Sequence, residues 1–294
     1  SRFILREAKY TYALTLTYDF THRESNAFMP IIAHLHTEDI ARPALVLVHG
    51  LGSAGTIWKS LIPQLIEHFS VYALDLPGHG VADFHPEEKF DPKSLAHAIV
   101  TELENSHGVQ QMHVAGNSLG GWIALEMGAV APEKVKSITA LAPAGLWHEP
   151  PKHWYPPSID SRILAKISRH FMTLAYRIAP LKAIGYKKIT HLWRELSFES
   201  CRDSVLAMAH SRGYMPMWNG ARGRKFESQI PAHINTSIIF GDYDLMLPED
   251  VAQEKAVAPA HSNWIVVENC AHVIMWNYPD LTVDFIRRTA ERSR

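Results

Sequence analysis

The sequence predicts an α/β protein with a mostly parallel, doubly wound sheet and an inserted helical cap. Over residues 43–141, short apolar runs alternate with helical stretches, and such alternation specifies a parallel sheet with helices on both faces. A proline-rich run at residues 149–157 interrupts the pattern, and strand-like runs resume only near residue 236. The 294 residues, 47% of them hydrophobic, can bury one large core.

The first predicted unit is a strand, a helix and a second strand. Residues 44–48 form a continuous branched apolar run that ends at His49 and Gly50, as expected of a strand buried on both faces. Residues 56–69 carry apolar side chains at helical spacing, and residues 71–74 form the next short apolar run before Asp75.

The alternation then continues to the interruption and resumes after it. Further predicted elements are a helix at 94–103, a strand at 112–115, a helix at 119–130, a strand at 137–141, strands at 236–240 and 264–267, and a last helix at 279–288. Residues 158–220 look mainly helical. We therefore expect a core from residues 1–146 and 232–294, with a helical cap inserted as residues 147–231.

Composition narrows the class of partner. Lys and Arg number 29 against 30 Asp and Glu, a formal charge of -1, so no broad basic surface is expected for nucleic acid or for an anionic membrane. The predicted partner is a small molecule of little charge. No stretch is long and apolar enough to span a bilayer, and oligomeric state is not predicted.

The cysteines and histidines do not indicate a metal site. Cys201 and Cys270 lie far apart, and the 18 His residues are scattered singly, so we expect neither a disulfide framework nor a bound metal. Two unpaired thiols favour a reducing, cytoplasmic location. Residues 1–13 carry charges throughout, which is not typical of a signal peptide.

The run Gly116-Asn117-Ser118-Leu119-Gly120 matches the G-x-S-x-G pattern between a predicted strand and a predicted helix. In that context a sharp turn lifts the Ser118 hydroxyl to the sheet edge, beside free amide groups at a helix N-terminus. The alternative is a serine that only caps the helix.

A serine hydroxyl needs a base and a carboxylate that orients the base. Gly241-Asp-Tyr-Asp244 follows one predicted strand, and Glu268-Asn-Cys-Ala-His272 follows the next. Both segments begin at the carboxyl end of a strand, where α/β sheets gather functional groups. The ordered series of Ser, Asp and His predicts nucleophilic catalysis.

From about residue 43 onward the chain resembles the α/β-hydrolases. The matching pieces are His49-Gly-Leu-Gly52, Asp75-Leu-Pro-Gly-His-Gly80, the serine elbow, Gly241-x-x-Asp244 and His272. The resemblance implies that Ser118 is the nucleophile, Asp244 the triad acid and His272 the base. It also implies that the amides of Leu51 and Leu119 form the oxyanion hole, and that no cofactor is needed.

Two other classes of function compete with a hydrolase. Gly50-Leu-Gly52-Ser-Ala-Gly55, with Asp75 ending the next strand, also fits a dinucleotide-binding fingerprint. An NAD-dependent oxidoreductase would leave Ser118, Asp244 and His272 unexplained, however. A hydrolase-like binding protein without catalysis is the third alternative.

Among hydrolases, an esterase acting on a small, largely apolar carboxylic ester is expected. The alternative is a meta-cleavage-product hydrolase, which splits carbon-carbon bonds and holds a substrate carboxylate with a cap arginine. Two details resemble that group, namely Asn117 at the elbow and Trp276, a candidate substrate contact four residues after His272. The alternatives are that Asn117 only caps the turn and that Trp276 is ordinary packing beneath the last helix. The cap arginines considered are Arg162, Arg169, Arg177, Arg194, Arg202 and Arg212.

Aromatic and methionine side chains of the cap are candidate walls of the substrate pocket, although most are expected to be internal packing. They are Trp154, Tyr155, Phe171, Met172, Tyr176, Trp193, Met208, Tyr214, Met215, Met217 and Trp218.

Overall fold

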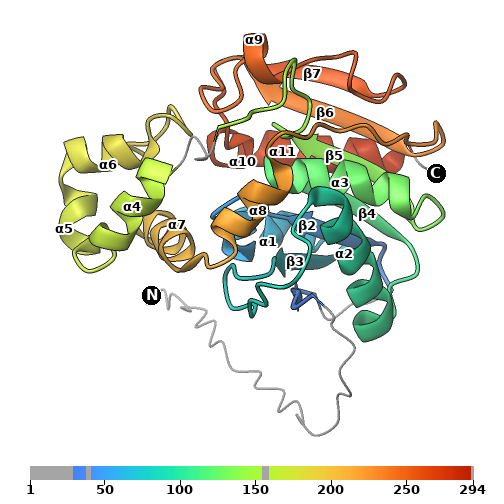
Figure 1. Cartoon of the computed structure of the whole chain (residues 1–294), viewed down its shortest axis with the longest axis horizontal. Coiled ribbons are helices and arrows are strands. Elements are labelled where there is room, and N and C mark those ends of the chain that lie inside the picture. Colours follow the sequence, from blue (N-terminus) through green and yellow to red (C-terminus); the bar gives the residue numbers. More distant parts are fainter. Residues whose placement is uncertain (1–28, 38–40, 154–158, 293–294) are drawn as a thin grey trace, which may run out of the picture.

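The computed structural model describes residues 29–37, 41–153 and 159–292. Within them, seven strands form one sheet in the order β1-β3-β2-β4-β5-β6-β7 (Figure 1). Only the edge pair of β1 and β3 is antiparallel, and the other pairs are parallel. The strands are β1 (Ile32–Leu35), β2 (Ala44–Val48), β3 (Ser70–Asp75), β4 (Met112–Asn117), β5 (Val135–Leu141), β6 (Asn235–Gly241) and β7 (Asn263–Val267).

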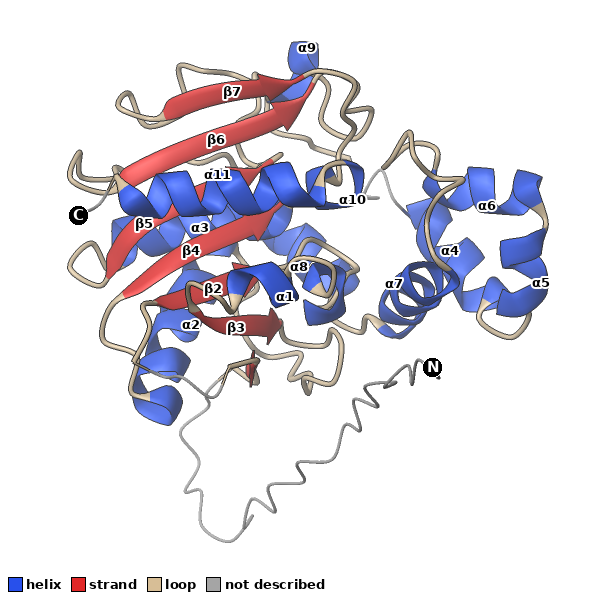
Figure 2. Ribbon diagram, turned by 180° about the vertical axis from the view of Figure 1, so that it is seen from behind, coloured by secondary structure: helices blue, strands red, loops and turns tan. Residues whose placement is uncertain are grey.

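Helices cover both faces of the sheet. In Figures 1 and 2, α2 (Pro92–His107) and α3 (Leu119–Val130) lie on one face, and α1 (Ile62–Leu65) and α11 (Pro279–Glu291) lie on the other. Two one-turn helices, α9 (Glu249–Ala252) and α10 (Ile274–Asn277), follow β6 and β7. The sequence sets the ends of α2: the Asp91 carboxylate accepts from the Ser94 amide at 3.1 Å, and Gly108 ends the helix with φ 66°.

The predicted α/β-hydrolase architecture is confirmed, with two local differences. The helix predicted over residues 56–69 is a 3-10 turn, Gly55–Trp58, followed by the short α1. Pro63 explains the break, because a proline has no amide hydrogen and its ring excludes the carbonyl four residues earlier. The antiparallel pairing of β1 with β3 was not predicted.

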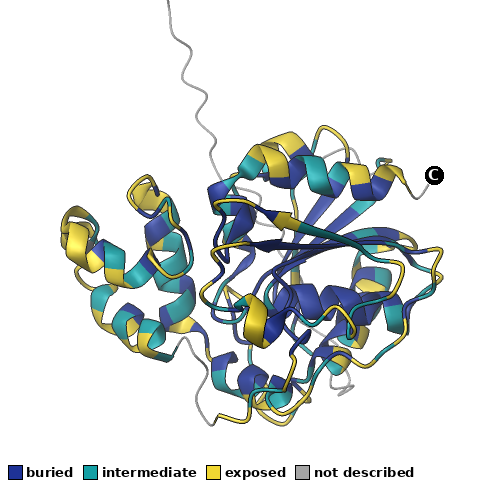
Figure 3. Cartoon of the chain, turned by 90° about the horizontal axis from the view of Figure 1, so that it is seen from above, coloured by how far each residue is buried: buried dark blue, intermediate teal, exposed yellow. Residues whose placement is uncertain are grey.

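The chain between β5 and β6 forms the cap. Its helices are α4 (Ile159–Ser168), α5 (Met172–Arg177), α6 (Ala179–Tyr186), α7 (Phe198–His210) and α8 (Tyr214–Ala221). Figure 3 shows α4 to α7 as a lobe beside the buried sheet. Lys59 on the core joins this lobe by ion pairs to Glu199 at 3.1 Å and Asp203 at 2.5 Å on α7.

The two ends of the cap insertion are joined to each other where they leave and re-enter the core. The Phe226 amide donates to the Gly145 carbonyl at 2.9 Å, and the Gly223 amide donates to the Pro151 carbonyl at 2.8 Å. The Trp147 indole donates to the Arg224 carbonyl at 2.9 Å. Helix α8 packs into the main core through Met217, so the last cap helix is part of the core packing.

Candidate active site

The turn between β4 and α3 holds Ser118 in a strained conformation, with φ 57° and ψ -120°. Glycines allow strand and helix to meet this closely. A Cβ on Gly116 would lie 2.1 Å from the Gly120 carbonyl oxygen, and one on Gly120 would lie 2.2 Å from the Val48 carbonyl oxygen. Such strain in a non-glycine residue is typical of functional positions.

Asp244 and His272, which are 28 residues apart, meet at the carboxyl ends of β6 and β7. Asp244 Oδ2 lies 2.8 Å from His272 Nδ1, and both side chains are buried. Asp244 Oδ1 accepts from the amides of Met246 and Leu247, at 2.8 Å each. Burial opposes ionisation of Asp244, but His272 and these two amides outweigh it and lower its pKa. This hydrogen bond fixes the orientation of the ring and leaves its other nitrogen, Nε2, available to a different partner.

Neighbouring side chains hold the loops that carry this pair. Asp242 does not contact His272; its Oδ1 accepts from the Cys270 amide at 3.0 Å. The Asn117 amide group donates to the carbonyls of Leu141, at 3.1 Å, and His272, at 3.3 Å. Asn117 therefore ties the elbow to the histidine loop, a role that the sequence pattern did not indicate.

The loop after β2 offers one free amide beside the elbow. The amides of Gly52, Ser53 and Gly55 donate to His79, Gly50 and Asp75, respectively. The Leu51 and Leu119 amides donate to no residue in the described part of the chain. Gly50 lies against Ser118, since a Cβ there would be 3.0 Å from Ser118 Cβ.

Two buried histidines and one buried carboxylate position this loop. His49 Nε2 accepts from the Leu76 amide, and His79 Nε2 accepts from the Gly52 amide, so in each ring Nδ1 carries the hydrogen that is donated to a carbonyl. Burial lowers the pKa of both, that of His79 to about 3. The rings are neutral at neutral pH.

Asp75 fixes the far end of the same loop. Its carboxylate accepts from the Gly55 amide at 2.7 Å, the Val81 amide at 3.0 Å and His34 Nε2 at 3.0 Å. Burial opposes ionisation, but these hydrogen bonds, with the His49 interaction, lower the pKa of Asp75 to about 2.

The dinucleotide alternative is wrong. Asp75, the residue that would hold a ribose, is buried and already bound by two amides and His34. The glycine-rich segment leads into a single 3-10 turn rather than the long helix whose N-terminus would hold a pyrophosphate.

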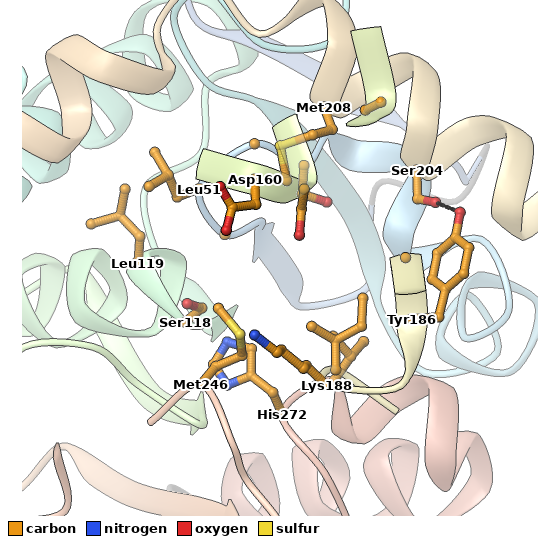
Figure 4. Close-up of a pocket in the computed structure, with 18 of the residues that line it drawn as sticks. Leu51, Ser118, Leu119, Asp160, Tyr186, Lys188, Ser204, Met208, Met246 and His272 are labelled. Carbon is orange, nitrogen blue, oxygen red and sulfur yellow. Dashed lines mark hydrogen bonds between the residues drawn. The ribbon is translucent and has the colours of Figure 1, made fainter. Parts of the chain in front are cut away.

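A cavity of about 1170 Å³ lies between the core and the cap. Ser118, His272, Leu51 and Leu119 all line it, and Figure 4 shows Ser118 and the His272 ring at the same end. The opposite wall comes from the cap, where Tyr186 bonds to Ser204 at 2.8 Å. The structure thus brings together Ser118, His272, Leu51 and Leu119 at the cavity, with Asp244 bonded to His272 behind them.

The cap supplies part of the predicted wall. Five of the candidates line the cavity: Met172, Tyr176, Met208, Met217 and Trp218. Four do not: Phe171 is exposed, Trp193 and Tyr214 are buried elsewhere, and Met215 lies outside the cavity. Trp154 and Tyr155 lie outside the described residues. Met217 and Trp218 are buried as well, so at these two positions internal packing and cavity lining coincide.

Trp276 lines the cavity and also packs against the cap, its ring centroid 6.2 Å from that of Tyr186. Lys188, which no sequence pattern singled out, lines the cavity too, and Figure 4 shows its side chain directed toward Ser118 and His272. The segment beyond it is anchored to the histidine loop, because the Val273 amide donates to the Ile189 carbonyl at 3.0 Å.

The model of the α/β-hydrolase fold family matches residues 43–279. The chain therefore belongs to the α/β-hydrolase family and is a hydrolase of that group. It is 29% identical over 251 residues to a pimeloyl-(acyl-carrier protein) methyl ester esterase of Aeromonas hydrophila, covering 83% of this chain and 94% of that protein.

Solved structures share the fold. An enol-lactonase from Burkholderia xenovorans superposes with a TM-score of 0.69 at 18% identity, covering 89% of this chain and 96% of the other. A meta-cleavage product hydrolase from Pseudomonas fluorescens gives 0.66 at 18% identity, covering 90% and 95%. None of the described helices is long and apolar enough to cross a membrane.

Proposed function

We propose that this hydrolase is a serine esterase that cleaves a small, largely apolar carboxylic ester through an acyl-enzyme intermediate. The observation that carries the proposal is the arrangement at one end of the cavity. There Ser118, on its strained turn, lies with a buried histidine that is paired to Asp244 at 2.8 Å.

In the proposed reaction, Ser118 Oγ attacks the ester carbonyl carbon while His272 Nε2 takes its proton. Asp244 holds the ring in the required tautomer and stabilises its positive charge. The free amides of Leu51 and Leu119 stabilise the oxyanion. His272 then returns the proton to the departing alcohol, and a water molecule that it activates releases the acid and restores Ser118.

The cavity wall supports an apolar acyl or alcohol group. Its cap side includes Leu164, Met172, Met208 and Trp218, which offer dispersion contacts, although Asp160 and Lys188 also line it. The methyl ester esterase relative is named for an ester substrate, in agreement with this choice.

The carbon-carbon hydrolase alternative requires a cation that holds a substrate carboxylate. None of the six cap arginines considered lines the cavity in the described residues, which favours the esterase. Lys188 is the cation directed toward Ser118. Lys188→Gln therefore tests the choice: hydrolysis of neutral esters should be nearly unchanged, whereas loss of a carboxylate contact would cost about 2 to 5 kcal/mol in transition-state binding.

The direct experiment combines fluorophosphonate labelling with a panel of p-nitrophenyl esters of graded length and a ring-cleavage dienoate. The wild type should be labelled and should cleave the esters, and Ser118→Ala should do neither. Ser161→Ala is the matched control, because Ser161 lines the same cavity from α4. Labelling of Ser118→Ala, or turnover of the dienoate with little ester turnover, would overturn the proposal.

A further inference from the structure

The cap carries a concentration of positive charge that the net charge of the whole chain conceals. Residues 159–188 contain seven Lys and Arg against one acidic residue, Asp160. Lys182 is buried and donates to two backbone carbonyls. Lys166, Arg169, Arg177 and Lys187 are exposed, and none of them forms an ion pair within the described chain. Lys188 is also exposed, but its side chain is directed into the cavity.

The same segment exposes large apolar side chains. Ile163 and Ile167 on α4, Phe171 and Leu174 at α5, and Ile184 on α6 are each between 54% and 65% exposed. Figures 1 and 2 place α4, α5 and α6 in the part of the cap that lies away from the sheet. Helices that expose apolar residues among Lys and Arg are typical of surfaces that bind a membrane interface.

A basic pocket lies beside these apolar residues. It has a volume of about 540 Å³ and is lined by Arg162, Lys166 and Arg169 of the α4 segment and by Ala209, His210 and Arg212 at the end of α7. The buried Nε of Arg162 has no hydrogen-bond partner among the described residues. Arg212 also forms an exposed ion pair with Asp83 at 3.4 Å. This chemistry fits a phosphate group.

The apolar surface continues into the main cavity. Ile184 and Leu181, which is 40% exposed, both also line the cavity that contains Ser118. On α4, Leu164 and Ala165 face that cavity, while Ile163 and Ile167 are exposed. Residues of the same helices therefore contribute apolar side chains both to the outer surface and to the cavity.

From these observations we propose that residues 159–188 dock on an anionic phospholipid bilayer, with a headgroup phosphate in the Arg162–Arg169 pocket and the exposed apolar residues in the acyl boundary. The net charge of the whole chain gave no sign of such a surface, because it averages this basic segment with the rest of the sequence. A symmetric contact with a second copy of the chain would place two sets of unpaired cations against each other, and their repulsion would disfavour it. A bilayer instead supplies negative charge and apolar volume together.

The test is flotation of the full chain with vesicles of phosphatidylcholine alone or mixed with phosphatidylglycerol. The wild type should bind the anionic vesicles and should dissociate from them at high salt, because salt screens the attraction between charges. Lys166→Gln with Arg169→Gln should weaken binding about thirtyfold, since each cation near the surface contributes roughly one kcal/mol. Ile167→Ser with Phe171→Ser should weaken it on the order of tenfold.

Control variants lie on exposed parts of the core: Lys93→Gln with Arg288→Gln for charge, and Val81→Ser for apolar area. They should bind as the wild type does. All these variants should keep their activity on water-soluble esters, so failure of docking is distinguishable from failure of the esterase proposal. Equal binding to neutral and anionic vesicles, or unweakened binding of both cap variants, would overturn the inference. Binding of inorganic phosphate or polyglutamate without vesicle binding would also overturn it.

Discussion

Replacement of Asp244 by asparagine should remove almost all activity while leaving the fold intact. The reason lies in the surroundings of its two oxygens. Oδ1 accepts from the amides of Met246 and Leu247, so an asparagine must place its oxygen there and its NH₂ group opposite His272 Nδ1. A donor at that position makes Nδ1 an acceptor and leaves the ring hydrogen on Nε2.

A ring with its hydrogen on Nε2 cannot take the Ser118 proton. In a known Ser-His-Asp triad, imposing this tautomer on the histidine lowers kcat about 10⁴-fold. Such a loss corresponds to an activation barrier higher by roughly 5 kcal/mol. The assay is kcat/KM on a p-nitrophenyl ester, with the thermal midpoint as a check on folding. The retained contacts to Met246 and Leu247 should keep that midpoint close to the wild-type value.

Asp242→Asn is the matched control. Asp242 follows the same strand, but its carboxylate accepts only from the Cys270 amide among the described contacts, and an asparagine oxygen can do the same. Its activity should change by no more than about twofold. A loss below about tenfold in Asp244→Asn, or an equal loss in both variants, would refute the tautomer argument.

Two further predictions concern stability. Burial lowers the pKa of His79 to about 3, whereas in the unfolded chain this histidine takes up a proton below about pH 6.5. The free energy of unfolding should therefore decrease as the pH is lowered below about 6.5. Urea titrations should show that His79→Gln removes ~1.4 kcal/mol per pH unit of this dependence between about pH 6 and pH 4; parallel curves for the two proteins would contradict it. Gly120→Ala places a Cβ 2.2 Å from the Val48 carbonyl and should cost more than about 3 kcal/mol. Gly185→Ala on α6 meets nothing within 4 Å and should instead stabilise by ~0.5 to 1 kcal/mol in the same titration; equal effects of the two variants would exclude the steric reason.

The parts of the fold that follow local rules could be predicted from the sequence. Residues 44–48 and 119–130 match β2 and α3 in full, because an unbroken branched apolar run and a glycine-rich turn before a helix depend on neighbouring residues alone. The position of Ser118, Asp244 and His272 could also be predicted, because parallel strands end at one edge of the sheet. Their catalytic roles remain proposals.

Other features depend on contacts between distant segments. His49 and His79 are two among 18 scattered histidines, and only the fold buries both within a ring-centroid distance of 5.3 Å. Nothing in the sequence distinguishes Lys188 from the other lysines. Its place in the cavity depends on the hydrogen bond that holds Ile189 beside the histidine loop. The basic pocket joins α4 to the end of α7, and neither segment alone predicts it.

The joined ends of the cap insertion bear on how this protein could acquire new substrates. Gly145 is hydrogen-bonded to Phe226, and Pro151 to Gly223. The segment between residues 151 and 223 is therefore a loop whose two ends are already held together. The entropy of closing a loop rises only logarithmically with its length. Segments of different length and composition could therefore be exchanged at this junction during evolution, or grafted in the laboratory, while strands β5 and β6 and the loops that they carry keep their register.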